Sequence, residues 1–195
     1  FIVNKIYTFL SRKIKQYLII INLHPFFNYR EIKNVKKNYI SQKFQNIAPS
    51  KEDELIYTNS YVAKQNLIDF LLTSFNLKSD RRFFIVLADS GMGKTTFSLN
   101  LYLKYNSLIR HFFNRNKFKI ALIPLGYDEA NNHIEKLKEN EEHHNTILIL
   151  DALDEDKKAI ENTTSRLTEI IEITKEFRFL IITCRTQFFN TEKLE

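Results

Sequence analysis

A glycine-containing run directly behind an apolar stretch constrains the fold of this chain more than any other feature. The run follows Phe83–Leu87 and reads Ala88, Asp89, Ser90, Gly91, Met92, Gly93, Lys94, Thr95 and Thr96. It holds two of the three glycines in 195 residues. When a strand ends in such a loop and a helix follows, backbone N–H groups and the positive end of the helix dipole point at an anion. The run therefore predicts a phosphate-binding loop between a strand and a helix.

The residues of this loop have expected parts in binding a nucleoside triphosphate. Lys94 is expected to reach the outer phosphates, and the Thr95 hydroxyl is expected to bind Mg²⁺. Gly91 and Gly93 leave room for phosphate oxygens and tolerate positive φ. Ala88 departs from the usual motif, which has glycine at that position. Because alanine is the smallest substitute, we expect the loop to tolerate it.

Short apolar stretches alternate with helical stretches, which predicts an α/β fold with a parallel sheet covered by helices on both faces. The predicted strands are 83–87, 118–125, 146–150 and 177–183, and the predicted helices between them are 94–109, 128–142 and 156–175. A further helix is expected to begin near Ser60 and to pack beside the sheet. Its apolar residues are Val62, Leu67, Ile68, Leu71 and Leu72.

A second strand end brings carboxylates to the same edge of the predicted sheet. Ligands of open α/β sheets bind at the carboxyl ends of the strands. Asp151 follows the strand over 146–150 and is therefore expected to contact Mg²⁺ directly or through water. Glu155 is the first candidate, and Asp154 the second, for the general base that orients the attacking water. The alternative interpretation is an acidic turn that caps the next helix.

A third strand end carries a hydroxyl and a guanidinium, in Thr183 and Arg185. The planar fork of Arg185 matches phosphate oxygens, so we expect it to sense the γ-phosphate. The alternative is a surface arginine paired with an acid. Cys184 is the only cysteine of the chain, which excludes an internal disulfide and suits a reducing cytoplasm. It is expected to be a buried apolar side chain, because no histidine lies beside it to activate a nucleophile.

The excess positive charge of the chain lies before the phosphate loop. The net charge is +6, and residues 1–50 contain nine Lys or Arg against one acidic residue, Glu31. The remaining residues contain 20 basic and 22 acidic side chains. We therefore expect a basic, mostly helical N-terminal extension or linker over 1–54 and an NTPase domain over 55–195. Nucleic acid, an anionic membrane or an acidic protein would suit the extension, and so would plain solvation.

The N-terminal segment is apolar in places but lacks the form of a membrane anchor. Residues 1–23 have helical periodicity, and the pair His24-Pro25 is expected to end that helix. The longest apolar run is Tyr17–Ile21, and four basic residues interrupt the rest. This segment is too short and too charged to span a bilayer.

Together the three strand ends resemble those of NACHT-type NTPases, a branch of the signal-transducing STAND ATPases. The resemblance covers about residues 55–190. It is most specific at Asp151–Glu155, where a small residue follows the first aspartate and an acidic pair comes next. The loop Asp89–Thr96 also resembles the family's form, and Ile181–Arg185 is similar to a sensor strand that is common in bacterial members. The resemblance implies a P-loop NTPase of the ASCE type.

The resemblance also implies roles for individual residues. Lys94, Thr95 and Asp151 would hold Mg-ATP, Asp154–Glu155 would support hydrolysis, and Arg185 would read the γ-phosphate. Proteins of this family are switches whose ATP-bound modules oligomerise and activate an effector after a sensor domain detects a ligand, in bacteria often for antiviral defence. We therefore expect a homo-oligomer of the full-length protein, with a sensor ligand and an effector that the residues do not name.

In such ATPases the sensor strand, here 177–183, lies between the phosphate-loop strand and the strand over 146–150. The family pattern continues into a further strand, a helical lid and a winged-helix domain, whereas this chain stops at Glu195. We therefore interpret it as a fragment. The strand over 83–87 would then present an open apolar edge, an aggregation hazard, and ATP hydrolysis would be slow or absent.

Two other functions remain open at this stage. One is an ATP-driven motor or loader of the AAA-like group that acts on nucleic acid, which the basic N-terminus favours. The other is a scaffold that binds a nucleotide without hydrolysing it.

Overall fold

A computed structural model describes residues 14, 17–44, 65–75, 81–107 and 118–188. Four parallel strands form its main sheet: β3 (Phe83–Leu87), β4 (Lys119–Pro124), β5 (Thr146–Asp151) and β6 (Phe179–Cys184). Their order is β3-β6-β5-β4. The strand that the family resemblance placed between the phosphate-loop strand and the acidic strand does lie there. Every residue of β5 and β6 is buried, as expected for central strands of a parallel sheet.

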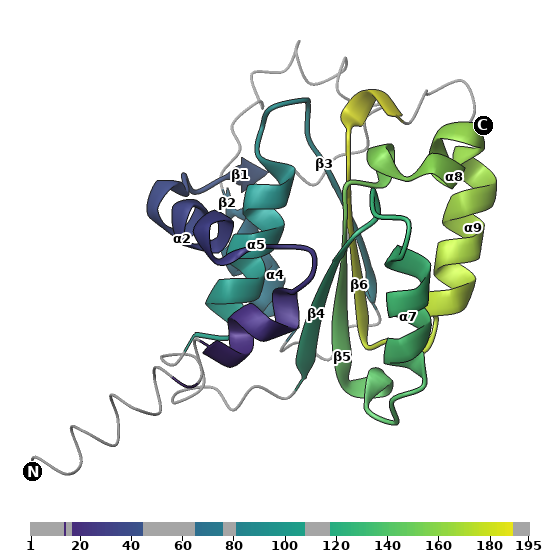
Figure 1. Cartoon of the computed structure of the whole chain (residues 1–195). Helices are drawn as coiled ribbons and strands as arrows, with labels where there is room; N and C mark the ends of the chain where they lie inside the picture. The colour runs from purple at the N-terminus through teal and green to yellow at the C-terminus, as the bar shows by residue number, and fades with distance from the viewer. Residues whose placement is uncertain (1–13, 15–16, 45–64, 76–80, 108–117, 189–195) are drawn as a thin grey trace, which may run out of the picture.

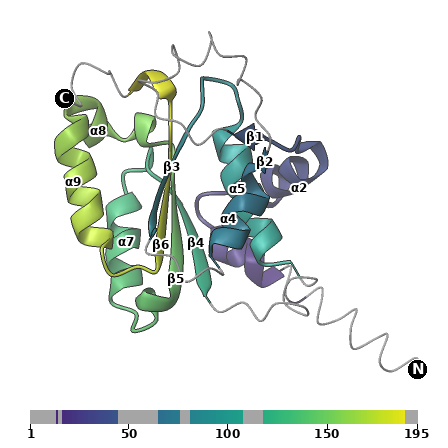
Figure 2. The same ribbon diagram turned by 180° about the vertical axis from the view of Figure 1, so that it is seen from behind.

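Helices cover both faces of this sheet, as the alternating sequence pattern predicted (Figures 1 and 2). One layer contains α4 (Leu67–Ser74) and α5 (Lys94–Tyr105), which follows β3. The opposite layer contains α7 (Ala130–Lys138), α8 (Lys157–Glu161) and α9 (Thr163–Thr174). Three short 3₁₀ turns complete these connections, η2 (His143–Asn145), η3 (Leu153–Glu155) and η4 (Thr186–Phe188). The fold is therefore α/β with a parallel sheet between two helical layers.

The prediction of one long helix over 156–175 is wrong, because Asn162 interrupts it. Asn162 has extended backbone angles, with φ −152° and ψ 96°, and its side chain accepts a hydrogen bond from the N–H of Ser165. Asp156 caps the first helix in the same way, accepting from the N–H groups of Lys158 and Ala159. Both residues satisfy N–H groups that a helix start leaves free. Apolar periodicity alone does not reveal such a break.

Other predicted bounds shift by a few residues. The polar helix predicted over 128–142 is shorter, since α7 ends at Lys138 and a turn leads to η2. The strand predicted over 146–150 includes Asp151 as its last residue. Ser60 and Val62 lie outside the described residues, and α4 begins at Leu67 behind the N-cap Asn66.

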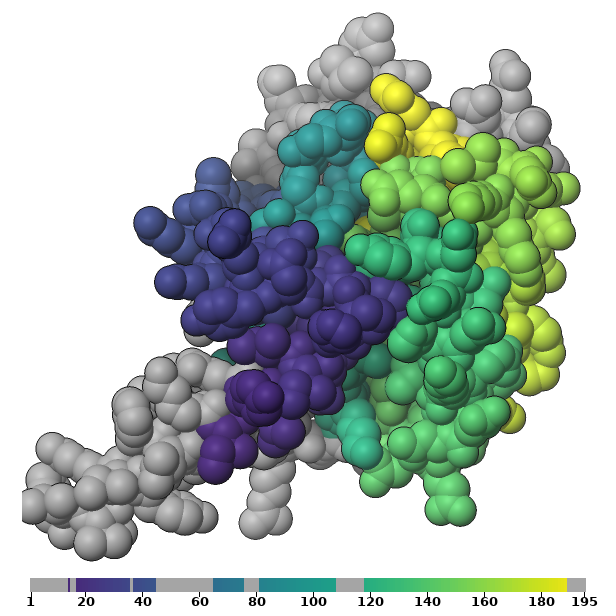
Figure 3. All heavy atoms as spheres, viewed as in Figure 1, coloured from purple at the N-terminus to yellow at the C-terminus, as the bar shows by residue number. Residues whose placement is uncertain are grey.

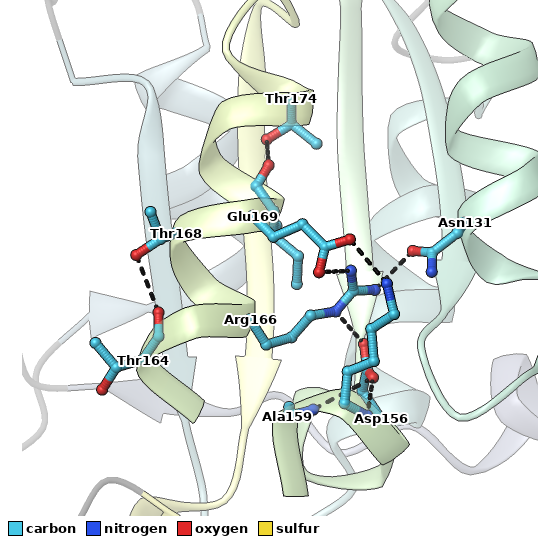
Figure 4. A network of polar contacts seen from close by, with 10 residues as sticks. Asn131, Asp156, Ala159, Thr164, Arg166, Thr168, Glu169 and Thr174 are labelled. Atoms are coloured by element: carbon cyan, nitrogen blue, oxygen red, sulfur yellow. Dashed lines mark hydrogen bonds and ion pairs between the residues drawn. The ribbon is translucent and has the colours of Figure 1, made fainter. Parts of the chain in front are cut away.

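A buried arginine joins three elements of the second helical layer (Figure 4). Arg166 on α9 donates from Nε to Asp156 Oδ2 and from Nη2 to Asn131 Oδ1 on α7, both at 2.7 Å. Its Nη1 lies 2.9 Å from Oε2 of Glu169, and Lys158 donates to the other oxygen of that carboxylate at 2.9 Å. Hydrogen bonding from Lys158, with a smaller contribution from Arg166, lowers the pKa of Glu169. This network holds the start of α8 against α7 and α9.

The N-terminal segment packs on the α/β core (Figure 3). The helix over residues 17–23 ends before His24, as predicted. The next helix is α2 (Tyr29–Asn38), which begins with a capping box between Asn28 and Glu31. A two-residue strand, β1 (Lys43–Phe44), then pairs antiparallel with β2 (Gln65–Asn66). Four side chains of this segment belong to the main core: Leu23, Phe26, Phe27 and Ile32. The domain boundary predicted after residue 54 lies outside the described residues.

The sequence predicted an open apolar edge at the strand over 83–87 and an N-terminal segment that cannot span a membrane. Within the described part of the chain, β3 is an edge strand that pairs only with β6. Its residues Phe83 and Ile85 are 47% and 51% exposed. The open apolar edge predicted at 83–87 is confirmed within these residues. Among the same residues, none of the helices is both long and apolar enough to cross a membrane.

Candidate functional site

The predicted site residues meet where the parallel strands end, at the top of the sheet in Figure 1. Parallel strands place all their carboxyl ends on one edge of the sheet, which is where ligands of open α/β folds bind. The β3–α5 loop, the turn η3 after β5 and the residues after β6 all leave from this edge. Residue pairing aligns the last residues of β3 and β6, Leu87 and Cys184. Segments distant in sequence thus converge here.

The β3–α5 loop contains two glycines in the left-handed backbone conformation. Gly91 and Gly93 both have φ +80°, a conformation that favours glycine. A Cβ at Gly91 would meet no atom within 4 Å, so the loop faces open space there. Gly93 is the N-cap of α5 and offers no side chain to cap the helix. The first N–H groups of α5 therefore keep their capacity to bind an anion.

The polar residues of this loop differ in exposure. Asp89, Ser90 and Thr95 are exposed, and Thr96 is half-buried. Ala88, the departure from the motif, is half-buried, and its N–H donates to the carbonyl of Cys184 at 3.1 Å. This backbone hydrogen bond joins the loop to the end of β6.

Lys94 and Arg185 both lie against one buried carboxylate, that of Asp154. Arg185 Nε lies 2.6 Å from Asp154 Oδ2, and Lys94 Nζ lies 3.8 Å from the same oxygen. The backbone N–H of Arg185 donates to Asp154 Oδ1 at 3.0 Å. The Asp154 side chain is only 3% exposed, whereas that of Arg185 is 46% exposed. The structure thus brings together three predicted site residues. It also pairs Arg185 with an acid, as the alternative interpretation of this residue expected.

Asp151 is fixed by two hydroxyl groups. Ser98 donates to Asp151 Oδ1 at 2.6 Å, and Thr183 donates to the same atom at 2.7 Å. The Thr183 oxygen also accepts from the N–H of Ala152 at 2.9 Å, so the hydroxyl proton is directed toward the carboxylate. Asp151 is therefore held as a buried acceptor at the strand end.

The turn after Asp151 separates the two remaining acidic residues. Ala152 has φ 59° and ψ 63°, the left-handed conformation, which is uncommon outside glycine. After this turn Leu153 is buried, Asp154 points to the two cations, and Glu155 is exposed. Glu155 is thus the acidic residue of the motif that remains open to solvent.

Sequence reasoning missed three contacts at this site. Ser98 lies one helical turn beyond Lys94, and that i, i+4 spacing was a signal for a second polar residue on the same face of α5. Gln42, from the N-terminal segment, donates from Nε2 to the carbonyl of Met92 in the loop at 2.8 Å. Gly126, after β4, lies against Glu155. No sequence signal indicated the contacts of Gln42 or Gly126, because both pairs are distant along the chain.

Cys184 is a buried thiol, as predicted. It is fully buried and forms no disulfide. Burial raises the pKa of Cys184 to about 12, and the charge of Asp154 adds to this rise. A thiol with such a pKa stays protonated at neutral pH and is a poor nucleophile.

The residues at this edge can be compared with the ligands that a magnesium–nucleotide complex requires. Among the described residues, no group of three or more His, Cys, Asp or Glu side chains could hold a metal ion. Mg²⁺ in nucleotide sites commonly takes one or two carboxylates, with phosphate oxygens and water as its other ligands. Asp151 supplies one carboxylate, the exposed residue Thr95 carries a hydroxyl, and the β3–α5 loop faces open space at Gly91. The residues present therefore fit the group.

The fold and this edge define an α/β protein with a candidate ligand site at the carboxyl ends of a parallel sheet. Comparison with protein-family models and with curated proteins finds no match.

Proposed function

We propose that this chain is the core of a P-loop NTPase of the ASCE type, a NACHT-like switch that binds and hydrolyses Mg-ATP. The observation that carries the proposal is the meeting of Lys94, Asp154 and Arg185 beside the glycine loop. Two cations drawn from different elements to one strand edge provide the positive charge that a triphosphate requires. The strand order β3-β6-β5-β4 supports the same class.

In this proposal the phosphate loop, residues 88–96, binds the phosphates. Its backbone N–H groups and Lys94 bind the phosphate oxygens, and Thr95 and Asp151 orient the metal ion. Mg-ATP, when bound, supplies the γ-phosphoryl group and the charge that the protein must stabilise. Most of the catalytic effect would come from positioning and electrostatics, as in other phosphoryl transfers.

Glu155 is the better of the two candidates for general base. The Asp154 carboxylate is buried and already accepts from Arg185 while facing Lys94, so it is poorly placed to take a proton from water. Glu155 is exposed at the same turn. Its carboxylate would accept the proton of the attacking water, with Asp154 holding the cations in place.

The ion pair between Arg185 and Asp154 supports the coupling of nucleotide state to conformation. A γ-phosphate competes with a carboxylate for the same guanidinium, because both match its fork of donors. Exchange of Arg185 from Asp154 to phosphate would change the contacts between β6 and η3. In the complete protein we propose that such a change controls homo-oligomer formation in the cytoplasm, with antiviral defence as a biological setting drawn from the family resemblance.

Two substitutions test the proposal. Lys94→Ala should lower the affinity for ATP and ADP by tenfold or more, whereas Lys104→Ala, at an exposed site on the same helix, should leave it unchanged. Glu155→Gln should keep ATP affinity and lower turnover by about 10²- to 10⁴-fold, with Glu161→Gln as the matched control. Unchanged affinity in Lys94→Ala would refute the site. Equal turnover in Glu155→Gln would leave a non-hydrolysing scaffold as the better description.

The basic surface of α2 favours a second candidate, an ATPase motor or loader that acts on nucleic acid. Arg30, Lys33 and Lys37 are exposed and share one face of α2, opposite buried Ile32. Glu31 bonds to the N–H of Asn28 in the capping box, so its carboxylate serves the helix start. Exposed lysine and arginine side chains on one helix face favour binding to a polyanion such as nucleic acid.

Nucleic acid distinguishes this candidate from the switch. A motor should hydrolyse ATP faster when DNA or RNA is added, and the stimulation should disappear in the triple variant Arg30→Glu, Lys33→Glu, Lys37→Glu. A switch should show the same low turnover with and without nucleic acid.

A further inference from the structure

Gly126, between β4 and α7, lies directly against the side chain of Glu155. A Cβ built at Gly126 would stand 3.1 Å from Glu155 Cβ and 3.2 Å from Glu155 Oε2. These separations are shorter than ordinary van der Waals contacts, so a Cβ at this position would require Glu155 to shift by a few tenths of an ångström. The glycine thus leaves the space that the Glu155 side chain occupies.

The backbone does not require glycine at this position. The described glycines with positive φ are Gly91 and Gly93, and Gly126 is not among them. Other residues could adopt the backbone angles of Gly126 without strain. Of the two usual reasons for a glycine, conformation and close approach, the second applies here.

The β4–α7 connection is also fastened to the segment that carries Glu155. The N–H of Leu125 donates to the carbonyl of Asp151 at 2.8 Å. Lys157, two residues beyond Glu155, donates to Asp128 at 2.7 Å. Farther along, on α7, the Asn131 side chain accepts a hydrogen bond from Arg166, which also donates to Asp156. The segment that carries Gly126 and the segment that carries Glu155 are therefore joined by hydrogen bonds on both sides of this contact.

We infer that Gly126 is a positioning residue for hydrolysis, setting where the Glu155 carboxylate lies relative to the bound phosphates. This inference rests on the proposed function, since it assumes that Glu155 accepts the proton of the attacking water. The position of a general base matters because a displacement of about 1 Å can cost about 100-fold in rate, so a shift of a few tenths of an ångström should cost several-fold. The β4–α7 connection is then a wall of the catalytic site, although it contributes no reacting group.

Gly126→Ala tests the inference with three measurements on the full chain: the single-turnover rate of ATP hydrolysis, the ATP dissociation constant and the midpoint of thermal unfolding. We expect the rate to fall by about 3- to 10-fold. ATP affinity should change by less than about twofold, because the phosphate loop is untouched. The unfolding midpoint should change little, because the small cost of moving Glu155 is offset by the restriction that alanine places on the unfolded chain. A merely structural role would lower stability and affinity along with the rate.

Glu129→Ala, an exposed substitution on the same connection, is the matched control and should keep the parent rate. Gly126→Ser is a second variant of similar size that should reproduce the loss. A parent chain that hydrolyses ATP while Gly126→Ala and Gly126→Ser keep the parent rate overturns the inference alone. A parent chain that binds ATP without any turnover contradicts the proposed hydrolysis, and the inference falls with it.

Discussion

Arg185 and Asp154 are joined twice, through the side chain and through the backbone of the arginine. Arg185 Nε lies 2.6 Å from Asp154 Oδ2, and the Arg185 N–H donates to Oδ1 at 3.0 Å. The two residues come from the ends of different strand connections, one after β6 and one in η3. Because Lys94 approaches the same carboxylate, a single buried acid organises both cations that our proposal assigns to phosphate.

The first prediction concerns the ability of Arg185 to distinguish ATP from ADP. Arg185→Ala should weaken ATP binding by about 10- to 100-fold, because a hydrogen bond to a charged group contributes about 1.5–3 kcal/mol. ADP affinity should change little, since the γ-phosphate is the proposed partner. Titration of the variant with both nucleotides provides the measurement, and Arg178→Ala is the control at the other end of β6. Equal losses for ATP and ADP would argue against a γ-phosphate contact.

The second prediction concerns the hydroxyl groups that hold Asp151. Ser98→Ala removes one of the two donors to Asp151 Oδ1 and should lower the free energy of unfolding by about 1–3 kcal/mol. Thr183→Val should cost at least as much, because it also leaves the N–H of Ala152 without its acceptor. Urea unfolding provides the measurement. Ser165→Ala, at an exposed position on α9, should stay within about 0.5 kcal/mol of the parent.

The third prediction concerns the buried Arg166 network. Arg166→Met should lower the free energy of unfolding by about 3–5 kcal/mol, because it leaves the buried Asp156 carboxylate without its cation. Lys158→Met removes a more exposed partner from Glu169 and should cost no more than about 1 kcal/mol. Denaturant unfolding of both variants compares the two losses. If both variants lost only a little unfolding free energy, other hydrogen-bond donors would have to stabilise the Asp156 carboxylate in place of Arg166.

The fourth prediction concerns pH. Because the pKa of Cys184 is raised to about 12 by burial, with a contribution from Asp154, the folded chain keeps this proton over a range in which the unfolded thiol loses it. The stability contributed by the neutral thiol is therefore complete below the unfolded pKa of about 8.5. It should decline as pH rises from there toward 12.

Cys184→Ala isolates this contribution. The difference in unfolding free energy between the parent and the variant should shrink between pH 8 and pH 10, by at most about 1.4 kcal/mol per pH unit. The slopes of the two proteins should be the same below pH 8. A difference that is independent of pH would show that the thiol ionises equally in both states.

Sequence patterns were most reliable where strong local constraints act. The strand 83–87 has the predicted bounds, and the helix after it begins at Lys94, because a glycine loop and an apolar run define both ends of the turn. The helix predicted over 156–175 failed at Asn162, whose side chain offers the backbone an alternative to helical hydrogen bonds. That outcome depends on capping contacts that periodicity does not encode.

For the candidate site, the motifs placed Lys94, Asp151, Asp154 and Arg185 at one edge, and the structure brings them there. The motifs could not indicate which acid takes the cations. Asp154 and Glu155 are adjacent in the chain and alike in chemistry, yet the left-handed turn at Ala152 is followed by a buried and an exposed carboxylate. Their different environments come from neighbours on β6, α5 and the β4–α7 connection.

The sequence by itself determined the glycine loop, the alternation of strands and helices, and the acidic and basic side chains at the strand ends. These features follow from local backbone preference and from the burial of apolar runs. Only the tertiary structure decided that Asp154 pairs with Lys94 and Arg185, that Ser98 and Thr183 hold Asp151, and that Gly126 faces Glu155. Such contacts join residues separated by tens of positions. They exist only when the strand order places their elements side by side, so no local pattern records them.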